Sequence, residues 1–438
     1  MKKALAILLA AVMVLGLFAG CSQTAPKQTD PATTTESAAS TTEAPTEAPT
    51  EAEPVTVRVA YWNSEETMNA LIDFWKEAVP EANVEFQFIE NSQYTNIMDT
   101  QMASGEGPDL IAVGTADAVK YTQLGYLEDL SAYADLFADA GKTLYTAEDG
   151  KLYALPGLSW FEGIYYNVDM FKEHNIALPT TFDEYLNVCK QLKDLGIIPL
   201  AAGLKDWSPM VKNSYALVTA DYLSKAEGKD FGKKFIAGET TFAETWKPHL
   251  ENWSRMISEG VYTQDMLGID PAQAMDSFVN GEAAMFCSGP WDLETLKQKN
   301  PNLNFDMMPF HGTEADGGWL IGGPGNGWAV NKDSKVKDVV MKLLDAYSTP
   351  EGQKAFWQGS QGSGSYLKGI ELDMPEQFNS VGATLSAGHV YCPWDEWGSV
   401  SAVIVDYGAE LQNYLMGVET LDEVLANTDL KAAELMEK

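Results

Sequence analysis

Hydrophobic and polar positions follow two alternating patterns along most of the chain. Val55–Trp62 alternates and is rich in β-branched residues, which predicts a strand. From Met68 to Val79 the apolar positions recur at spacings of three and four, which predicts a helix capped by Asn63 or Ser64. Strands that alternate with helices in this way favour βαβ units. We therefore predict an α/β protein whose sheets are mostly parallel.

The same two patterns recur toward the C-terminus. Further strands are predicted over Asn83–Ile89, Leu110–Val113, Lys151–Tyr153, Gly163–Tyr166, Ile197–Leu200, Ala283–Cys287 and Phe305–Met308. Further helices are predicted over Tyr94–Ser104, Thr181–Leu195, Trp291–Lys299, Ser334–Tyr347, Val400–Met416 and Leu421–Met436. The 384 residues after position 54 exceed what one hydrophobic core supports, so we expect two domains.

The first 54 residues do not follow either pattern. Lys2 and Lys3 precede an apolar run, Ala4–Ala19, that is shorter than the roughly 20 residues of a membrane-spanning helix. Leu17–Cys21 resembles the lipobox of bacterial lipoproteins, with Phe18 where that motif usually has Leu, Val or Ile. This resemblance implies a lipoprotein signal peptide over 1–20 and a lipid on Cys21. The alternative is an ordinary secretory signal with an incidental cysteine.

Residues 21–54 predict a disordered linker. They consist almost entirely of Thr, Ala, Glu, Pro, Ser and Gln, and this composition buries too little apolar surface to offset the entropy of ordering. With a lipid on Cys21, the linker would anchor the folded part to the outer face of the cell membrane without spanning it.

Charge and cysteine content exclude several kinds of function. The residues after position 54 carry 57 acidic and 26 basic side chains, a net charge of −31, which repels nucleic acid. Cys189, Cys287 and Cys392 form no disulfide framework; a bridge between Cys287 and Cys392 is one reading and buried free thiols the other. The four histidines lack a zinc pattern, and the glycine-rich segment 317–328 lacks the register of a nucleotide loop. We expect no metal and no other cofactor.

Eight short motifs in a fixed order resemble the family of extracellular sugar-binding proteins of ABC importers, the group that includes maltose-binding protein. The motifs are Gly105–Asp109, Gly125–Leu130, Gly150–Pro156, Tyr165–Asn167, Pro179–Glu184, Phe278–Met285, Gly289–Trp291 and Thr349–Gly352. The resemblance runs from about Val55 to the C-terminus.

The resemblance implies a two-lobed periplasmic-binding-protein-like fold of type II, hinged by three crossings, with the ligand held between the lobes. By analogy, the N-lobe holds 55–161 and 305–350, and the C-lobe holds 162–304 and 351–438. The crossings are then expected near Ser159–Gly163, Asn302–Phe305 and Thr349–Gly352.

A sugar offers apolar CH faces and many hydroxyls, so its site needs flat aromatic rings together with carboxylates. In the N-lobe, the candidates are Trp62, Glu65, Glu66, Tyr94 and Asp117. Other readings stay open for four of them: the two glutamates suit the start of a helix, Asp117 suits an N-cap and Tyr94 suits the core.

The candidates in the rest of the chain include several tryptophans that lie in connecting segments. They are Trp160 and Glu162 in the first crossing, Trp207, Trp291, Gly322, Gly323, Tyr366, Trp394, Asp395 and Trp397. Trp291 matches the stacking tryptophan of the family. For Trp394 and Trp397, a purely structural role at the start of a helix is the alternative.

We therefore expect a monomeric binding protein that closes on a small carbohydrate, presents it to the membrane subunits of an ABC permease and performs no chemistry on it. Two alternatives remain. Either the same fold binds a peptide, an amino acid or a polyamine, or the chain is a secreted glycoside-active enzyme with two carboxyls about 5–9.5 Å apart.

Overall fold

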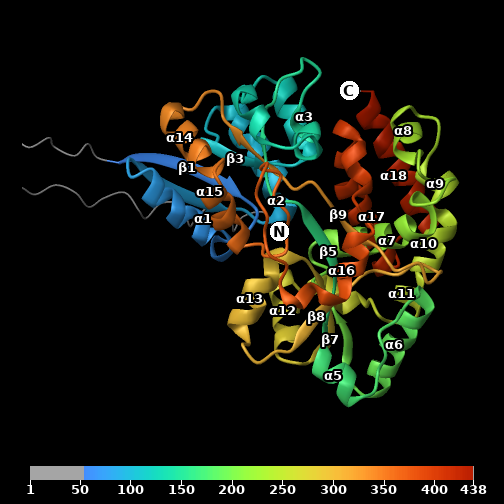
Figure 1. Ribbon diagram of the computed structural model, residues 1–438. Helices are drawn as coiled ribbons and strands as arrows, with labels where there is room; N and C mark the ends of the chain where they lie inside the picture. The colour runs from blue at the N-terminus through green and yellow to red at the C-terminus, as the bar shows by residue number, and fades with distance from the viewer. Residues whose placement is uncertain (1–53, 438) are drawn as a thin grey trace, which may run out of the picture. The chain divides into compact units, whose positions relative to one another are not determined.

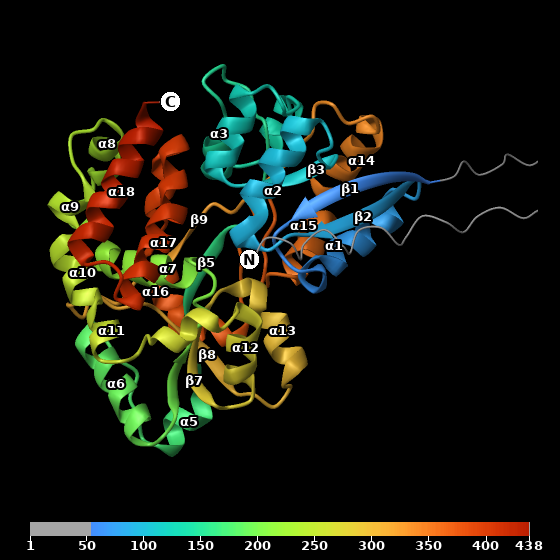
Figure 2. The same ribbon diagram turned by 180° about the vertical axis from the view of Figure 1, so that it is seen from behind.

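The computed structural model describes residues 54–437, which form two β-sheets covered by helices (Figures 1 and 2). The first sheet has the order β2-β1-β3-β10-β4. Its strands are β1 (Val55–Tyr61), β2 (Ala82–Phe88), β3 (Leu110–Val113), β4 (Leu155–Pro156) and β10 (Gly327–Val330). β1 runs parallel to β2 and β3, whereas β10 runs antiparallel to β3 and β4. We call this sheet and the helices packed on it the first lobe.

The helices of the first lobe come from both ends of the chain. They are α1 (Glu65–Ala78), α2 (Asn91–Ser104), α3 (Thr115–Gln123), α4 (Asp139–Lys142), α14 (Lys337–Tyr347) and α15 (Pro350–Gln358), with short 3-10 turns at Ser131–Leu136 and Thr143–Tyr145. Ser64 caps α1 by accepting a hydrogen bond from the Thr67 amide, as the sequence predicts. The indole of Trp75 donates to the Leu343 carbonyl, 2.9 Å away, and so joins α1 to α14.

The second sheet has the order β11-β9-β5-β7-β6, with β8 also paired to β5. Its strands are β5 (Trp160–Asn167), β6 (Ile198–Ala201), β7 (Ala283–Ser288), β8 (Phe305–Met308), β9 (Leu320–Gly323) and β11 (Val390–Tyr391). β5 is antiparallel to β7, β8 and β9, so the expectation of a mostly parallel sheet is wrong here. Strand periodicity shows where a strand lies but not which partner it pairs with. We call this sheet and its helices the second lobe.

Helices cover both faces of the second sheet. They are α5 (Val168–Glu173), α6 (Phe182–Asp194), α7 (Ser208–Val218), α8 (Phe231–Ile236), α9 (Phe242–Thr245), α10 (Lys247–Trp253), α11 (Arg255–Ser258), α12 (Pro271–Val279), α13 (Leu293–Lys299), α16 (Gly382–Ser386), α17 (Val403–Met416) and α18 (Leu421–Met436). Short turns are η3 (Thr219–Leu223), η4 (Gln264–Gly268), η5 (Pro290–Asp292), η6 (Glu376–Val381), η7 (Pro393–Glu396) and η8 (Gly398–Ala402).

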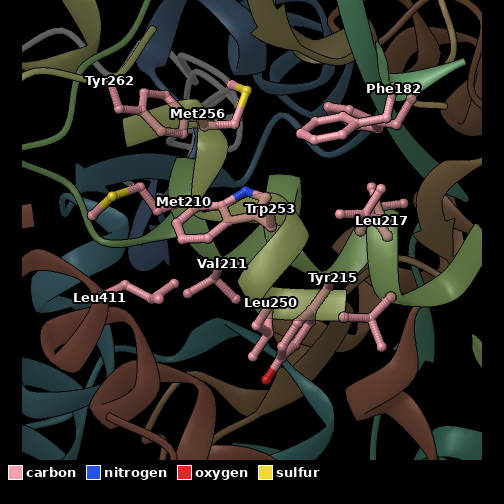
Figure 3. Packing of buried hydrophobic residues seen from close by; sticks show 14 of the residues in the cluster. Phe182, Met210, Val211, Tyr215, Leu217, Leu250, Trp253, Met256, Tyr262 and Leu411 are labelled. Carbon is pink, nitrogen blue, oxygen red and sulfur yellow. The ribbon is translucent and has the colours of Figure 1, made fainter. Parts of the chain in front are cut away.

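Helix α7 is fixed by the larger core of the second lobe. Figure 3 shows the indole of Trp253 among Met210, Val211, Met256 and Tyr262, all of which are buried. The Trp253 indole also donates to the side-chain oxygen of Asn213, at 2.7 Å, so the polar atom of this large ring is paired. These contacts hold α7 in one orientation relative to the sheet.

The chain passes between the two sheets at places that differ in part from those predicted. It leaves the first sheet after β4 and enters the second at Trp160. Since β8 and β9 pair with β5, residues 305–323 belong to the second sheet, and the second crossing is 324–326 rather than 302–305. Phe356 and Leu367 lie in the core of the first lobe, so the third crossing follows Leu367 rather than lying at Thr349–Gly352.

Two of these crossing segments approach each other closely. The Gly157 amide donates to the Asn326 carbonyl at 2.7 Å, and a Cβ added at Gly325 would lie 1.8 Å from the Leu158 carbonyl oxygen. The Ser159 amide donates to the Gly364 carbonyl, also at 2.7 Å. Only glycine allows backbones to approach this closely at position 325.

Other sequence expectations have mixed outcomes. The predicted strand at Lys151–Tyr153 is wrong, because only Leu152 makes a single bridge, to Thr146. Cys189, Cys287 and Cys392 are free thiols, so the Cys287–Cys392 bridge is not formed. The signal peptide, Cys21 and the linker lie outside the described residues. Within residues 54–437, no helix is both long and apolar enough to cross a membrane.

Candidate functional site

Three tryptophans from separate segments gather at one end of the second sheet. Trp160 begins β5, Trp291 lies in η5 and Trp394 lies in η7. The centroid of the Trp160 ring is 6.3 Å from that of Trp291 and 6.1 Å from that of Trp394. All three side chains are half-buried. We call these residues the tryptophan cluster, and they are the predicted site residues that the structure brings together most clearly.

Local backbone geometry explains how Trp291 reaches this position. Strand β7 ends at Ser288, and Gly289 turns the chain into η5. A Cβ added at Gly289 would lie 2.2 Å from the Trp291 ring and 2.3 Å from the Phe161 carbonyl oxygen. The indole therefore folds back over a residue that must lack a side chain.

A buried ion pair lies against the tryptophan cluster. Lys212 of α7 places its ammonium 2.7 Å from Oε2 of Glu162, whose side chain is only 3% exposed. The same ammonium is 5.3 Å from the centroid of the Trp291 ring and 5.9 Å from that of Trp160, both within cation–π range. Burial raises the pKa of Glu162, and Lys212 opposes that shift.

Two further acids surround this pair. Asp292 accepts a hydrogen bond from Ser288 Oγ, and burial raises its pKa to about 6. Asp206 lies two residues before α7 begins and accepts a hydrogen bond from the Ser208 amide at 2.7 Å. Burial would lower the pKa of Lys212, but Glu162, Asp206 and Asp292 act against it and the net shift is upward. Lys212 is therefore charged at neutral pH, within a group of acids.

Asp395 is the predicted site residue with the least compensated charge. Its Oδ2 is buried and has no hydrogen-bond partner within residues 54–437. A Cβ added at Gly323 would lie 2.9 Å from this oxygen, so glycine makes room for the carboxylate. Burial raises the pKa of Asp395 to about 7. Burial and, secondly, Asp395 raise the pKa of Tyr366, which packs against the core of the first lobe.

The predicted residues of the first lobe fall into two groups. Trp62 is half-buried and stacks on Tyr61, with 5.1 Å between the ring centroids. Glu65 and Glu66 are exposed in the first turn of α1. Tyr94 is buried, and its hydroxyl donates to the carbonyls of Ala60 and Ala112. The structure therefore assigns Tyr94 to the core.

Asp117 also has a structural role, although not the predicted N-cap. Gly114 caps α3, whereas Asp117 is buried in its first turn. One carboxylate oxygen of Asp117 accepts from Thr95 at 2.9 Å, and the other lies 3.1 Å from the Lys120 ammonium. Both of its oxygens are thus paired within the first lobe.

The remaining predicted residues lie in the second lobe. Trp397 is 1% exposed and packs on Phe235, Phe242 and Trp246, so it is a core residue and its assignment to a ligand surface is wrong. Trp207 is half-buried against Gly408 of α17. Gly322 pairs with Phe161 in the sheet, next to Trp160.

Sequence reasoning missed Lys212, Asp206 and Asp292. A lysine in the middle of a helix is normally solvent-exposed, and nothing in its neighbours along the chain signals an ion pair with a residue 50 positions away. Of these three residues, only Asp292 had a signal in the sequence, because it directly follows the predicted stacking tryptophan. Tyr215, whose ring lies 5.4 Å from that of Trp394, was likewise indistinguishable from a core residue.

Chemically, this arrangement combines flat apolar surfaces with carboxylates that accept hydrogen bonds. Aromatic rings suit the CH faces of a sugar ring, and carboxylates suit its hydroxyls. The cation that lies over two rings of the tryptophan cluster, the Lys212 ammonium, is held by Glu162.

Comparisons with known proteins agree with the fold. A multiple sugar-binding protein of Streptococcus mutans is 23% identical over 373 residues, which cover 82% of this chain and 86% of the relative. A galactooligosaccharide-binding protein of Bacillus subtilis is 23% identical over 57% of this chain and 59% of the relative.

Solved structures share the two-lobed architecture. A chitin oligosaccharide binding protein matches with a TM-score of 0.75 at 20% identity, over 88% of this chain and 100% of its own. A sugar transporter of Bacillus licheniformis solved with stachyose gives 0.70 at 19% identity, over 87% and 100%. The family model for bacterial extracellular solute-binding proteins matches residues 61–354. The chain belongs to the family of bacterial extracellular solute-binding proteins.

Proposed function

We propose that this chain is the substrate-binding lipoprotein of an ABC importer, which captures a sugar or oligosaccharide and delivers it unaltered to a membrane permease. The observation that carries the proposal is the tryptophan cluster, where three half-buried indoles converge beside acceptor carboxylates. Indole rings suit the apolar CH faces of a saccharide, and carboxylates suit its hydroxyls. The names of the relatives, which include sugar-binding and galactooligosaccharide-binding proteins, support the same class of ligand.

Capture is proposed to work by closing the two lobes. A ligand that contacts Trp160, Trp291 and Trp394 in the second lobe and residues near Tyr366 in the first stabilises the closed arrangement over the open one. Its binding free energy shifts the population toward that arrangement. The permease then recognises the closed form. Lipidation at Cys21 is proposed to keep the protein near its permease.

A panel of saccharides tests the function. Purified protein lacking residues 1–20 is heated with neutral mono- and oligosaccharides, including stachyose and chitin oligosaccharides. A ligand that binds only the folded state raises the melting temperature, and calorimetry on each hit gives its affinity. If no saccharide raises the midpoint, the proposal fails.

Trp291→Ala tests the site within that panel. Loss of one stacking ring is expected to weaken binding of the best saccharide by about tenfold or more, which corresponds to roughly 1.4 kcal/mol. Trp319→Ala is the matched control, since Trp319 is also half-buried but stacks on His389 outside the tryptophan cluster. Equal affinities for the two variants would remove the tryptophan cluster from the site.

The enzyme alternative is separated by product analysis. Incubation of the same saccharides with the protein is expected to return them unchanged, whereas a glycoside-active enzyme releases shorter sugars. Saturable binding without turnover supports a carrier.

A further inference from the structure

The faces of Trp160 and Trp291 already have a cation against them. Indole faces attract cations, and clusters of aromatic rings recognise quaternary ammonium ligands in this way. Here the Lys212 ammonium lies 5.3 Å from one ring centroid and 5.9 Å from the other. A cationic ligand at this point would therefore compete with a charge belonging to the protein.

Lys212 is held firmly in that place. Its partner Glu162 is 3% exposed and 2.7 Å away, and Glu162 forms no other ion pair within residues 54–437. Helix α7, which carries Lys212, is fixed by the packing of Met210 and Val211 around Trp253 (Figure 3). Moving the ammonium aside would leave a buried carboxylate without a partner, which is unfavourable.

Negative charge surrounds the same point. Asp206 and Asp292 lie close enough to Lys212 to raise its pKa, and Asp395 follows Trp394 directly. An anionic ligand would meet these acids, and the Lys212 ammonium that could attract it is already paired with Glu162. Both signs of ligand charge are therefore disfavoured.

From this geometry we infer that Lys212 is a specificity-determining residue, which excludes cationic ligands from the tryptophan cluster by occupying the position that a ligand cation would take. This inference rests on the proposed function and narrows its ligand class: Lys212 excludes amino sugars and polyamines, while the surrounding acids disfavour uronic acids and sugar phosphates.

The test replaces the ammonium by an uncharged side chain of similar length. In Lys212→Met the Glu162 carboxylate remains beside two indoles with no cation, so the site gains affinity for tetramethylammonium. The expected gain over the wild-type chain, measured by calorimetry, is about tenfold or more. tert-Butanol, similar in shape but uncharged, is expected to show no gain.

The double variant Lys212→Met, Glu162→Gln is the matched control. It keeps the indoles but removes the carboxylate, and it is expected to lose the gain. The inference is overturned if a folded Lys212→Met variant shows no gain, if the double variant gains as much as the single one, or if the wild-type chain binds tetramethylammonium as tightly as Lys212→Met does. Circular dichroism and the melting temperature establish folding, and Lys212→Gln replaces Lys212→Met if the latter unfolds.

This experiment separates the inference from the proposed function. The tetramethylammonium comparison needs no sugar, so it reports on Lys212 even if the saccharide panel is negative. Conversely, saccharide binding together with an unchanged tetramethylammonium affinity in Lys212→Met would retain the proposed function and reject the role of Lys212.

Discussion

Two carboxylates near the tryptophan cluster, Asp292 and Asp395, hold protons more tightly than exposed aspartates do, because burial disfavours their charged forms. They differ in what compensates them. Asp292 accepts a hydrogen bond from Ser288, whereas Oδ2 of Asp395 has no partner among residues 54–437. The titratable groups that influence or are influenced by Asp395 are Tyr145, Tyr366, Tyr391, Cys392 and Glu396. None of these groups is a cation, and only the hydrogen bond with the Cys392 side chain lowers the pKa of Asp395, so ionisation of Asp395 destabilises the folded state. At this scale the sequence singled out Trp160, Trp291 and Trp394, because indoles in connecting segments stand out, and the structure brings these three rings together. Their role in binding stays a prediction. Sequence reasoning failed at Trp397, whose burial depends on Phe242 and Trp246 far away in the chain, and at Lys212.

Ionisation of Asp395 predicts a dependence of stability on pH. Its folded-state pKa of about 7 lies above the usual value of 3.8. The stability that the folded state gains by holding this proton is therefore fully present below about pH 4 and is lost as the pH rises through 7. Asp395→Asn removes this loss. We expect the variant to be more stable than the wild-type chain at pH 8, by up to about 4 kcal/mol, with the advantage shrinking toward pH 5. Denaturant unfolding at both pH values measures it; an advantage that does not change with pH would contradict the assignment.

Among the elements, strands and helices with regular periodicity are where sequence reasoning succeeded. β3 and β8 have the predicted bounds because each is a short apolar segment, and α18 has them because its helical pattern follows a clear cap at Thr420. The assignment of β8 to a lobe failed, since pairing with β5 depends on contacts distant in sequence.

The connection from β7 to η5 positions one ring of the tryptophan cluster. Gly289 gives the turn, Trp291 folds over it, and the start of β5 lies against both.

Gly289→Ala tests that connection. The added Cβ conflicts with the Trp291 ring and the Phe161 carbonyl, so the indole must move out of the tryptophan cluster. We expect about a tenfold or greater loss of affinity for the best saccharide. Gly382→Ala is the control, because a Cβ there meets nothing within 4 Å and its backbone is helical. Calorimetry on both variants measures the effect, and similar affinities would mean that the turn does not position Trp291.

The whole molecule carries a strong excess of acid: with His neutral, its net charge is −34 over the full chain. Such an excess destabilises a compact state through self-repulsion, and salt screens it. We expect the melting temperature to rise by about 1–3 °C between 20 and 300 mM sodium chloride, measured by calorimetry at pH 7.5. Sucrose at equal osmolality serves as a comparison without added ions. A midpoint that falls with salt would show that specific ion pairs outweigh the general repulsion.

At this scale the two-lobed fold was predictable from the order of motifs, but the crossings were not, because they depend on which sheet each strand joins.

The crossing segments also constrain how the chain can be made. β10, which lies between β3 and β4, and the helices α14 and α15 all come from beyond residue 326, so the first lobe stays unfinished until most of the polypeptide exists. Pairing of such distant segments is slow compared with local structure formation. A nascent chain that stops short of Gly327 therefore lacks the strand that joins β3 to β4, and its first sheet stays incomplete.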